Sequence, residues 1–424
     1  MPTTPYWLDT APRLTRGAEG PVAGRYDVAV VGAGLTGLSS ALRLARSGAS
    51  VLVLDAGTVV GEASGRNGGQ CNTGMAHDYA AVIEAHGRDT AACFHHAYAA
   101  AVTEVETLVA DHGIDCDFRR CGKLKLAAKP EHYDGLARAH TLMNREFEAG
   151  TELLDAQQIR HEIGAEAFHG GLLMPDAAQL HVGRFGVGLA EAAARHGAAI
   201  HEHTALTGLQ RNAHGFALQT ANGRAQADQV VLATGASRTG PLGWFRRRIV
   251  PVGSFIVVTE PLAGATLDRL LPRRRNYVTS RIIGNYFRAT PDDRLLFGGR
   301  ARFSMSGATA DQKAGAILRR GLCETFPDLA DTAIDYCWGG LVDMTQDRLP
   351  RAGEDRGLHY AMGYSGHGVQ MSVHMGGVLA ERIATGNSRN PWAHLSWPAI
   401  PGHFGTPWFL PAVGAWYRIK DRLR

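Results

Sequence analysis

The chain has 424 residues, which is more than one hydrophobic core usually serves, so two or three structural units are expected. Hydrophobic residues make up 45% of the chain and charged residues 20%, and this composition excludes a chain that is disordered throughout. The net charge of +4 is small and the arginine clusters of the chain are short, so neither indicates nucleic-acid binding.

A βαβ unit is predicted near the start of the chain. Residues 26–34 are apolar and end in glycines, which is typical of a strand buried on both faces of a parallel sheet. Residues 36–47 have apolar positions at helical spacing, and the apolar segment 50–56 is predicted to be the second strand. This order favours a nucleotide-binding unit.

Gly32, Gly34 and Gly37 form a GxGxxG pattern at the turn between this strand and the helix. Glycines at these positions permit a tight turn and a close approach of the backbone to a pyrophosphate at the helix N-terminus. Asp55 follows Gly37 by eighteen residues, where a carboxylate can accept hydrogen bonds from a ribose. We therefore predict a dinucleotide site.

A second glycine-rich loop covers residues 61–74, with five glycines, two asparagines and Arg66. Such a loop has few side chains to bury and many backbone N–H groups to offer a ligand. An NAD enzyme needs no second glycine loop here, whereas a buried and extended FAD does. FAD is therefore the expected cofactor, and a flexible surface linker is the alternative.

The middle of the chain alternates between helical and strand patterns. Residues 76–150 are predicted to form amphipathic helices over an antiparallel sheet, to which 121–128 contributes a strand. A helix is expected at 182–198, then a hairpin turn at Asn222-Gly223 and a buried strand at 229–237.

Candidate substrate-binding residues occur in the strands after residue 284. Alternation along 285–289 and the following segment places Tyr286 and Arg288 on one face, and Arg300 and Arg302 together on another. An arginine on a face that covers the flavin can clamp a substrate carboxylate through two parallel hydrogen bonds. The alternative for each arginine is an exposed salt bridge.

A second helix N-terminus is expected where the turn around His367 precedes the helical pattern at 373–386. Its N–H groups and positive dipole suit a group that develops negative charge. His367 can add a charge or a hydrogen bond to substrate, or it can be a surface or capping histidine. Trp338 is expected either in the wall of the substrate cavity or in the core.

Several of these segments, in this order, resemble the D-amino-acid-oxidase-like family of FAD-dependent amine and amino-acid oxidoreductases. Within that family, the chain is most similar to the gamma-glutamylputrescine oxidase branch. The segments that carry the resemblance are VVGAGLTGLSSALRLA (30–45), ASGRNGGQ (63–70), RLLFGG (294–299), IDYCWGG (334–340), GYSGHGV (363–369) and the tail from 406 to 423.

The resemblance implies an α/β and α+β fold, in which a Rossmann-like FAD-binding domain is combined with a discontinuous antiparallel-sheet substrate domain. The expected FAD-binding domain comprises 25–75, 151–239 and 335–385. The substrate domain would comprise 76–150 and 240–334, and residues 386–424 would form a C-terminal extension.

The motifs and the resemblance together predict the residues that contact FAD. These are Gly32, Gly34, Leu35, Thr36, Gly37, Asp55, Ala56, Ala63, Ser64, Arg66, Asn67, Gly68, Gly69, Gln70, Leu206, Ala233, Thr234, Gly235, Gly363, Gly366, His367, Gly368, Val369 and Gln370. Non-covalent FAD is expected, although some relatives attach flavin to cysteine and Cys337 lies near the relevant region.

The implied reaction is oxidation of a C–N bond of a small-molecule amine, with gamma-glutamylputrescine or a similar acylated polyamine as the favoured substrate. A hydride would pass to flavin N5, and the resulting imine would hydrolyse to an aldehyde and an amine or ammonia. His367 and Tyr286 are the candidate catalytic residues. Arg288, Arg300, Arg302 and Trp338 are the candidate substrate-binding residues.

Some alternatives stay open at this point. A sarcosine or D-amino-acid dehydrogenase and a non-catalytic FAD-binding subunit fit the same fold. Some relatives carry an oxygen-activating lysine on the strand at 294–299, where this chain has arginine only at the ends, so oxygen is the favoured acceptor but another acceptor is an alternative.

No metal site is expected, because the six cysteines include no CxxC pair and the histidines form no HExxH motif. The first residues lack a basic start followed by an apolar run, and no stretch of 18 apolar residues occurs. We therefore expect a cytoplasmic protein with no membrane span. A monomer or homodimer is the expected oligomeric state.

Overall fold

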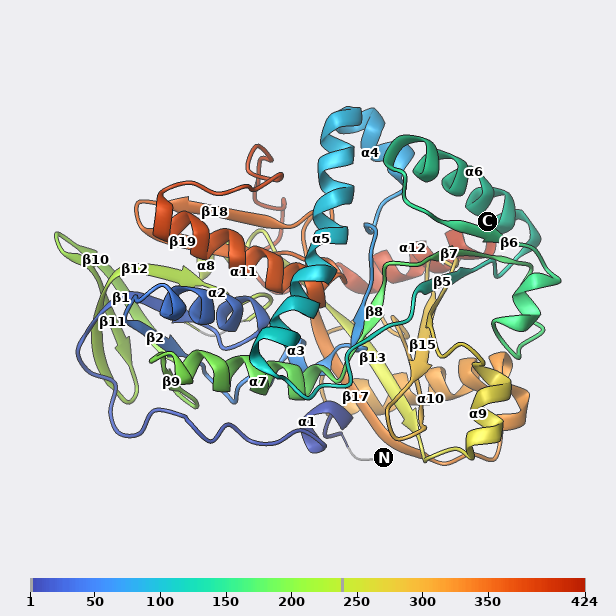
Figure 1. The fold of residues 1–424 in the computed structure, drawn as a ribbon, viewed down its shortest axis with the longest axis horizontal. Coiled ribbons are helices and arrows are strands. Elements are labelled where there is room, and N and C mark those ends of the chain that lie inside the picture. Colours follow the sequence, from blue (N-terminus) through green and yellow to red (C-terminus); the bar gives the residue numbers. More distant parts are fainter. Residues whose placement is uncertain (1–2, 238–239, 424) are drawn as a thin grey trace.

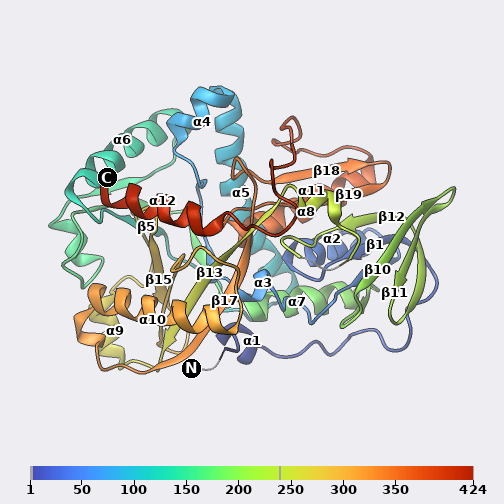
Figure 2. The same cartoon turned by 180° about the vertical axis from the view of Figure 1, so that it is seen from behind.

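The computed structural model describes residues 3–237 and 240–423. Two eight-stranded sheets dominate it, one on the left and one on the right of Figure 1, and a small three-stranded sheet accompanies them. Helix α5 (Arg88–His112) lies between the two halves in this view, and Figure 2 shows the same arrangement from behind.

The first sheet has a parallel centre. Its main order is β10-β11-β12-β1-β2-β9, and β19 pairs with β12 and with β18. The strands are β1 (Arg25–Val31), β2 (Val51–Leu54), β9 (Ala199–His201), β10 (Leu206–Asn212), β11 (Gly215–Thr220), β12 (Gly223–Leu232), β18 (Arg351–Asp355) and β19 (Leu358–Met362). The predicted hairpin is confirmed, because Thr220 pairs with Gly223 across the turn that contains Asn222.

Both faces of this sheet are buried, as the continuous apolar pattern predicts. Val28 and Val30 contribute to the core under the helices, whereas Ala29 and Val31 pack with the β10–β11 hairpin on the other face. The covering helices are α2 (Leu35–Arg46), α7 (Val182–Arg195) and α11 (Gly368–Thr385), and they lie side by side in Figure 1.

The second sheet has the order β17-β13-β16-β15-β14-β5-β7-β6 and is antiparallel except for the pair β14 and β5. Its strands are β5 (Lys123–Leu126), β6 (Glu152–Leu154), β7 (Gly171–Met174), β13 (Val250–Thr259), β14 (Asn276–Thr279), β15 (Asn285–Ala289), β16 (Leu295–Gly299) and β17 (Ile334–Met344). Phe287 and Phe297 face α10 (Ala308–Thr325), whereas Tyr286 and Leu296 face the large core shared with the first sheet. The candidate active site lies on the face of this sheet that carries Tyr286 and Leu296.

The remaining elements are short or peripheral. They are α1 (Tyr6–Asp9), α3 (Ala63–Arg66), α4 (Tyr79–His86), α6 (Pro130–Phe147), α8 (Gly243–Arg246), α9 (Gly264–Leu270) and α12 (Leu410–Leu423), the three-stranded sheet of β3 (Gln70–Cys71), β8 (Ala178–Gln179) and β4 (Arg119–Arg120), and 3₁₀ turns at Gln158–His161 and Pro327–Leu329. Helix α12 lies in the foreground of Figure 2, in front of the second sheet.

Two expected domain boundaries differ from the strand pairing. Strands β6, β7 and β17 belong to the second sheet, although the expected FAD-binding domain begins again at residues 151 and 335. β17 pairs with β13 from Val250 to Thr259, so residues up to Met344 belong with the substrate-side sheet. An apolar strand has the same sequence pattern in either sheet, so only its pairing partner shows to which sheet it belongs. The rest of the division is retained as a proposal.

Within residues 3–237 and 240–423, no helix combines the length and the apolar character that a membrane crossing requires. The same described residues contain no group of three or more histidine, cysteine or acidic side chains placed to hold a metal ion.

Candidate active site

The turn between β1 and α2 is so tightly packed that only glycine fits at two positions. Gly32 has φ of 106°, and a Cβ atom there would lie 2.6 Å from the carbonyl oxygen of Ala233 at the end of β12. A Cβ atom on Gly37 would lie less than 3.0 Å from the carbonyl oxygen of Gly32. The turn therefore holds β1, α2 and the end of β12 in close contact, as the GxGxxG pattern predicts.

The N-terminus of α2 has no side-chain cap from its own N-cap residue. Its N-cap residue is Gly34, which has no side chain to cap the first turn, and the Leu35 N–H donates to Ser64 Oγ over 3.0 Å. The first N–H groups and the positive end of the helix dipole suit a phosphate. Ser64 belongs to the second glycine-rich loop, so the two predicted FAD segments meet at this helix end.

Asp55 lies at the end of β2 beside the same turn. Its carboxylate accepts the Ala33 N–H at 2.6 Å and the Gly57 N–H at 2.8 Å, and burial raises the pKa of this carboxyl group. The Thr204 N–H donates to the Asp55 carbonyl at 2.6 Å, which brings the start of β10 and the predicted contact Leu206 near this point. The carboxylate is thus positioned where the dinucleotide fold places a ribose.

The turn before α11 joins these segments. The Tyr364 hydroxyl lies 2.7 Å from Thr36 Oγ1 in the first turn of α2. On α11, Gln370 Nε2 donates to the carbonyl of Asn72 in the second glycine-rich loop over 2.6 Å. The predicted segments 32–37, 63–70 and 363–370 therefore converge, although more than 300 residues separate the first from the last.

Side chains of the second glycine-rich loop hold the loop itself in place. Arg66 Nε donates to the carbonyl of Gly61 at 2.8 Å, and Asn67 Oδ1 accepts the Gly69 N–H at 2.8 Å. Trp338 is fully buried and its indole N–H donates to the Arg66 carbonyl at 2.9 Å. Trp338 therefore supports the loop from the core, which is one of its two expected roles.

Arg288 has a different position from the one expected for a substrate clamp. Its side chain is 1% exposed, and Nη1 donates to the carbonyls of Gly69 at 2.6 Å and Leu180 at 3.0 Å. Nε donates to the Ala289 carbonyl at 3.0 Å, and burial lowers the pKa of the guanidinium to about 10. Nε and Nη1 are engaged with backbone carbonyls, and this geometry weighs against the expected role of Arg288 as a substrate clamp. Alternation placed Arg288 on the same face as Tyr286, but its long side chain ends at Gly69 in the second glycine-rich loop.

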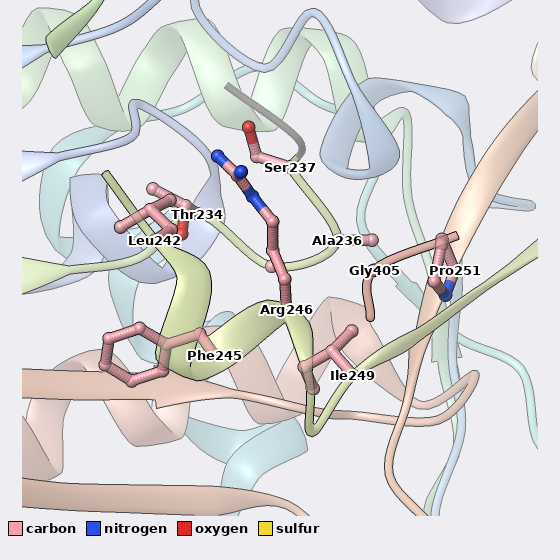
Figure 3. Close-up of a pocket in the computed structure, with 10 residues that line it drawn as sticks. Thr234, Ala236, Ser237, Leu242, Phe245, Arg246, Ile249, Pro251 and Gly405 are labelled. Atoms are coloured by element: carbon pink, nitrogen blue, oxygen red, sulfur yellow. The ribbon is translucent and has the colours of Figure 1, made fainter. Parts of the chain in front are cut away.

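A pocket opens at the carboxyl end of β12, where Thr234 and Gly235 were expected to contact FAD. Figure 3 shows its lining, in which Arg246 extends beside Thr234 and Ser237. The other lining residues are Ala236, Leu242, Phe245, Ile249, Pro251 and Gly405. In parallel α/β sheets, ligands bind beyond the carboxyl ends of the strands, so this position fits a cofactor site.

Tyr286 and His367 share the face between the two sheets. The Tyr286 ring fills the space above Gly298, where a Cβ atom would meet its Cζ at 2.5 Å, and its hydroxyl lies 3.4 Å from Ser254 Oγ. His367 precedes α11 and packs edge-on against Tyr98, with ring centroids 5.7 Å apart. Burial and the positive charges of Lys123 and Arg300 lower the pKa of His367 to about 3, so its imidazole is neutral at ordinary pH.

Lys123 is a site residue that the sequence reasoning missed. It begins β5, is 8% exposed, and Nζ donates to the Thr73 carbonyl over 2.6 Å. Burial lowers its pKa to about 7. The KLKL sequence of β5 could have indicated the position of Lys123. Leu124 and Leu126 pack in the hydrophobic cluster on the face of the second sheet covered by α9 and α10, so the alternating lysines must face the opposite side.

We expect Lys123→Met to stabilise the protein more at acid pH than at alkaline pH. The unfolded chain keeps a proton on this lysine up to its ordinary pKa of 10.5, whereas the folded chain releases it near pH 7. The free energy of unfolding of the wild type therefore rises with pH between about 7 and 10.5. Below about pH 7 the lysine is buried in its charged form, and its cost to stability is largest there. The gain in melting temperature should be largest at about pH 6 and small at about pH 10.

The matched control for this lysine is Lys313→Met, in an exposed position on α10. Its effect on the melting temperature should be small and nearly the same at both pH values. Equal shifts for Lys123→Met at the two pH values would contradict a buried lysine of lowered pKa.

Cys337 lies on the opposite face of β17 from the site. It packs in the cluster under α10, its thiol donates to the Asp311 carbonyl at 3.4 Å, and burial raises its pKa to about 11. This position gives no support to a covalent flavin link. The glycine turn, the uncapped end of α2 and the Asp55 carboxylate together fit a non-covalent FAD.

Comparison with known proteins supports the same assignment. The family model described as FAD dependent oxidoreductase (DAO) matches residues 27–382. Gamma-glutamylputrescine oxidoreductase of Escherichia coli (strain K12) is 32% identical over 404 residues, which cover 94% of this chain and 93% of that protein. The probable oxidoreductase OrdL of Rhizobium meliloti (strain 1021) is 32% identical over 408 residues, covering 95% and 94%.

Among solved structures, glycine oxidase from Geobacillus kaustophilus has a TM-score of 0.71 at 22% identity, covering 90% of this chain and 98% of that one. L-amino acid deaminase from Proteus myxofaciens has a TM-score of 0.72 at 19% identity, covering 88% and 93%. The fold class and the FAD cofactor predicted from the sequence are confirmed. The chain therefore belongs to the DAO family of FAD-dependent oxidoreductases.

Proposed function

We propose that this enzyme oxidises a C–N bond of an acylated amine, and that gamma-glutamylputrescine or a similar acylated polyamine is its favoured substrate. The observation that carries the proposal is the convergence of Tyr286, His367 and Lys123 on the face beside the FAD segments. Support for the substrate class comes from the gamma-glutamylputrescine oxidoreductase of Escherichia coli, which matches almost the full length of the chain.

Bound FAD supplies the acceptor for a hydride from the carbon next to the substrate nitrogen, and the imine product hydrolyses to an aldehyde and an amine or ammonia. The chain has to position the amine and to stabilise charge. The N-terminus of α11, an 18-residue helix, points its positive dipole end at the site and stabilises developing negative charge.

Tyr286 and His367 are the proposed catalytic residues, because both present polar groups on the site face. The Tyr286 hydroxyl can donate to or accept from the substrate. Nδ1 of His367 is buried without a hydrogen-bond partner among the described residues, and a neutral imidazole does not repel a positively charged amine. Lys123, with its pKa lowered to about 7, can take up a proton from the substrate near neutral pH.

Oxygen is the proposed acceptor of the electrons, and the cytoplasmic location expected from the sequence remains a prediction. A small-amino-acid oxidase is the alternative function, since glycine oxidase of Geobacillus kaustophilus is 27% identical over 372 residues. Arg288, one of the candidate carboxylate clamps near the flavin, is engaged with the backbone, which weighs against this alternative.

The proposal is tested by mixing the FAD-loaded protein with candidate substrates in the absence of oxygen. We expect gamma-glutamylputrescine to bleach the flavin absorbance at least about tenfold faster than sarcosine or D-alanine, a difference of about 1.4 kcal/mol in activation free energy. Faster bleaching by sarcosine or D-alanine would favour the alternative. Readmitting oxygen and comparing peroxide formation with dye reduction then identifies the acceptor.

A further inference from the structure

Arg300 lies at the edge of the site and has no anionic partner among the residues that the structure describes. It follows β16 directly and is half-buried. Among the described residues its strongest electrostatic neighbours are Arg348, Tyr417 and Tyr286, and burial together with Arg348 lowers the pKa of its guanidinium. Two half-buried arginines that repel each other are unfavourable unless an anion binds between or beside them.

Arg348 is likewise free of acidic partners in the described part of the chain. It lies in the turn after β17, and Nη2 donates to the Tyr417 hydroxyl over 3.1 Å. Its neighbour Asp347 is bound by Arg351, and Asp421, one turn beyond Tyr417 on α12, accepts the Ile282 N–H at 2.9 Å. These two carboxylates are therefore engaged with partners other than Arg348.

The arginine pair lies between the catalytic face and the C-terminal helix. The positive charge of Arg300 acts on both Tyr286 and His367. It favours the deprotonated form of Tyr286 and the neutral form of His367. On the other side, Tyr417 belongs to α12. This helix packs on Phe303, in the segment after β16, through Gly414 and through the Tyr417 ring, whose centroid lies 5.6 Å from that of Phe303. Figure 2 shows α12 covering this side of the sheet.

We propose that Arg300 and Arg348, with the Tyr417 hydroxyl, form a carboxylate-binding site for the end of the substrate remote from the reacting amine. The chain would thus act on amines whose acyl group carries a carboxylate. Guanidinium groups bind carboxylates through paired, charge-assisted hydrogen bonds, and a free diamine would leave both arginines unpaired and be repelled by them. This inference deepens the proposed function and rests on it for the identity of the reacting amine.

Two substrates that differ in the carboxylate test the proposal. Gamma-glutamylputrescine and N-acetylputrescine offer the same reacting amine and the same amide, but only the first has a carboxylate. We expect Arg300→Gln and Arg348→Gln to raise KM for gamma-glutamylputrescine about 10- to 100-fold and to leave KM for N-acetylputrescine within about twofold. Arg320→Gln, at an exposed position on α10, is the matched control and should change neither KM.

A parallel rise of both KM values, or no change in either, would overturn the carboxylate site. Direct binding separates this outcome from a failure of the proposed reaction. Calorimetry with the FAD-loaded protein should show binding of glutarate but not of the neutral glutaramide, with glutarate affinity reduced at least about tenfold in both site variants and unchanged in Arg320→Gln.

If glutarate and glutaramide bind equally, or if both site variants bind glutarate as the wild type does, the arginine pair is not a carboxylate site, whatever amine is oxidised. If glutarate binding follows the expected pattern and no amine bleaches the flavin, the carboxylate site stands and the proposed reaction is wrong.

Discussion

Gly37→Ala should yield a protein without bound FAD and with a free energy of unfolding lowered by roughly 3 kcal/mol or more. The added Cβ atom would overlap the carbonyl oxygen of Gly32 and lie 3.0 Å from Val30 Cγ1. A Cβ atom has no rotamer that avoids a backbone atom, so α2 must move away from β1. That movement displaces the helix N-terminus that we assign to the phosphates.

The absorbance ratio of flavin to protein and a denaturation curve measure this effect. Gly264→Ala is the matched control, because its added Cβ atom at the start of α9 would meet nothing within 4 Å. The control should retain FAD and wild-type stability. A Gly37→Ala protein that retains both would show that the tight β1–α2 turn is not needed for the cofactor.

Arg288→Met is expected to lower the free energy of unfolding by roughly 2 to 4 kcal/mol and to weaken FAD binding. Methionine keeps much of the apolar volume but removes the donors to the carbonyls of Gly69, Leu180 and Ala289. The Gly69 carbonyl keeps the Leu180 N–H as a donor at 3.0 Å, so its loss is partial. A buried carbonyl left without a donor costs about 1 to 3 kcal/mol, and relief from burying the charge offsets part of the total. The hydrogen bond to the Gly69 carbonyl also holds the second glycine-rich loop in place.

This substitution separates the two roles considered for Arg288. If Arg288 has a structural role, the Arg288→Met protein should be less stable and should lose FAD more easily. Urea denaturation measures the first effect and flavin released on dilution measures the second. A substrate clamp predicts a stable FAD-loaded protein with only a raised KM, and that result would contradict the structural role. Arg356→Met, whose side chain is 79% exposed, should change stability by no more than about 0.5 kcal/mol.

Local patterns in the sequence were sufficient to predict the β1–α2 turn and its close packing. The β1–α2 turn is encoded by glycines a few residues apart, and their role depends on nearby backbone atoms such as the Gly32 carbonyl. Alternation along β15 correctly placed Tyr286 and Arg288 on the same face of the strand. Such short-range rules require no knowledge of the rest of the chain.

Features that depend on distant partners could not be predicted in the same way. The Arg288 guanidinium binds carbonyls more than 100 residues away, at Gly69 and Leu180. Lys123 lies on a strand face that is usually solvated but is covered here by the shared core. Arg348 and Tyr417 come from a turn and from the last helix, and only tertiary packing joins them.

Anaerobic titration of the FAD-loaded protein with gamma-glutamylputrescine tests the central claim most directly. We expect the flavin absorbance to be lost in proportion to substrate added, with an aldehyde formed in an amount equal to the flavin reduced. A spectrum that stays oxidised at saturating gamma-glutamylputrescine, while sarcosine or a D-amino acid bleaches it, would contradict the assignment of this enzyme to acylated amines.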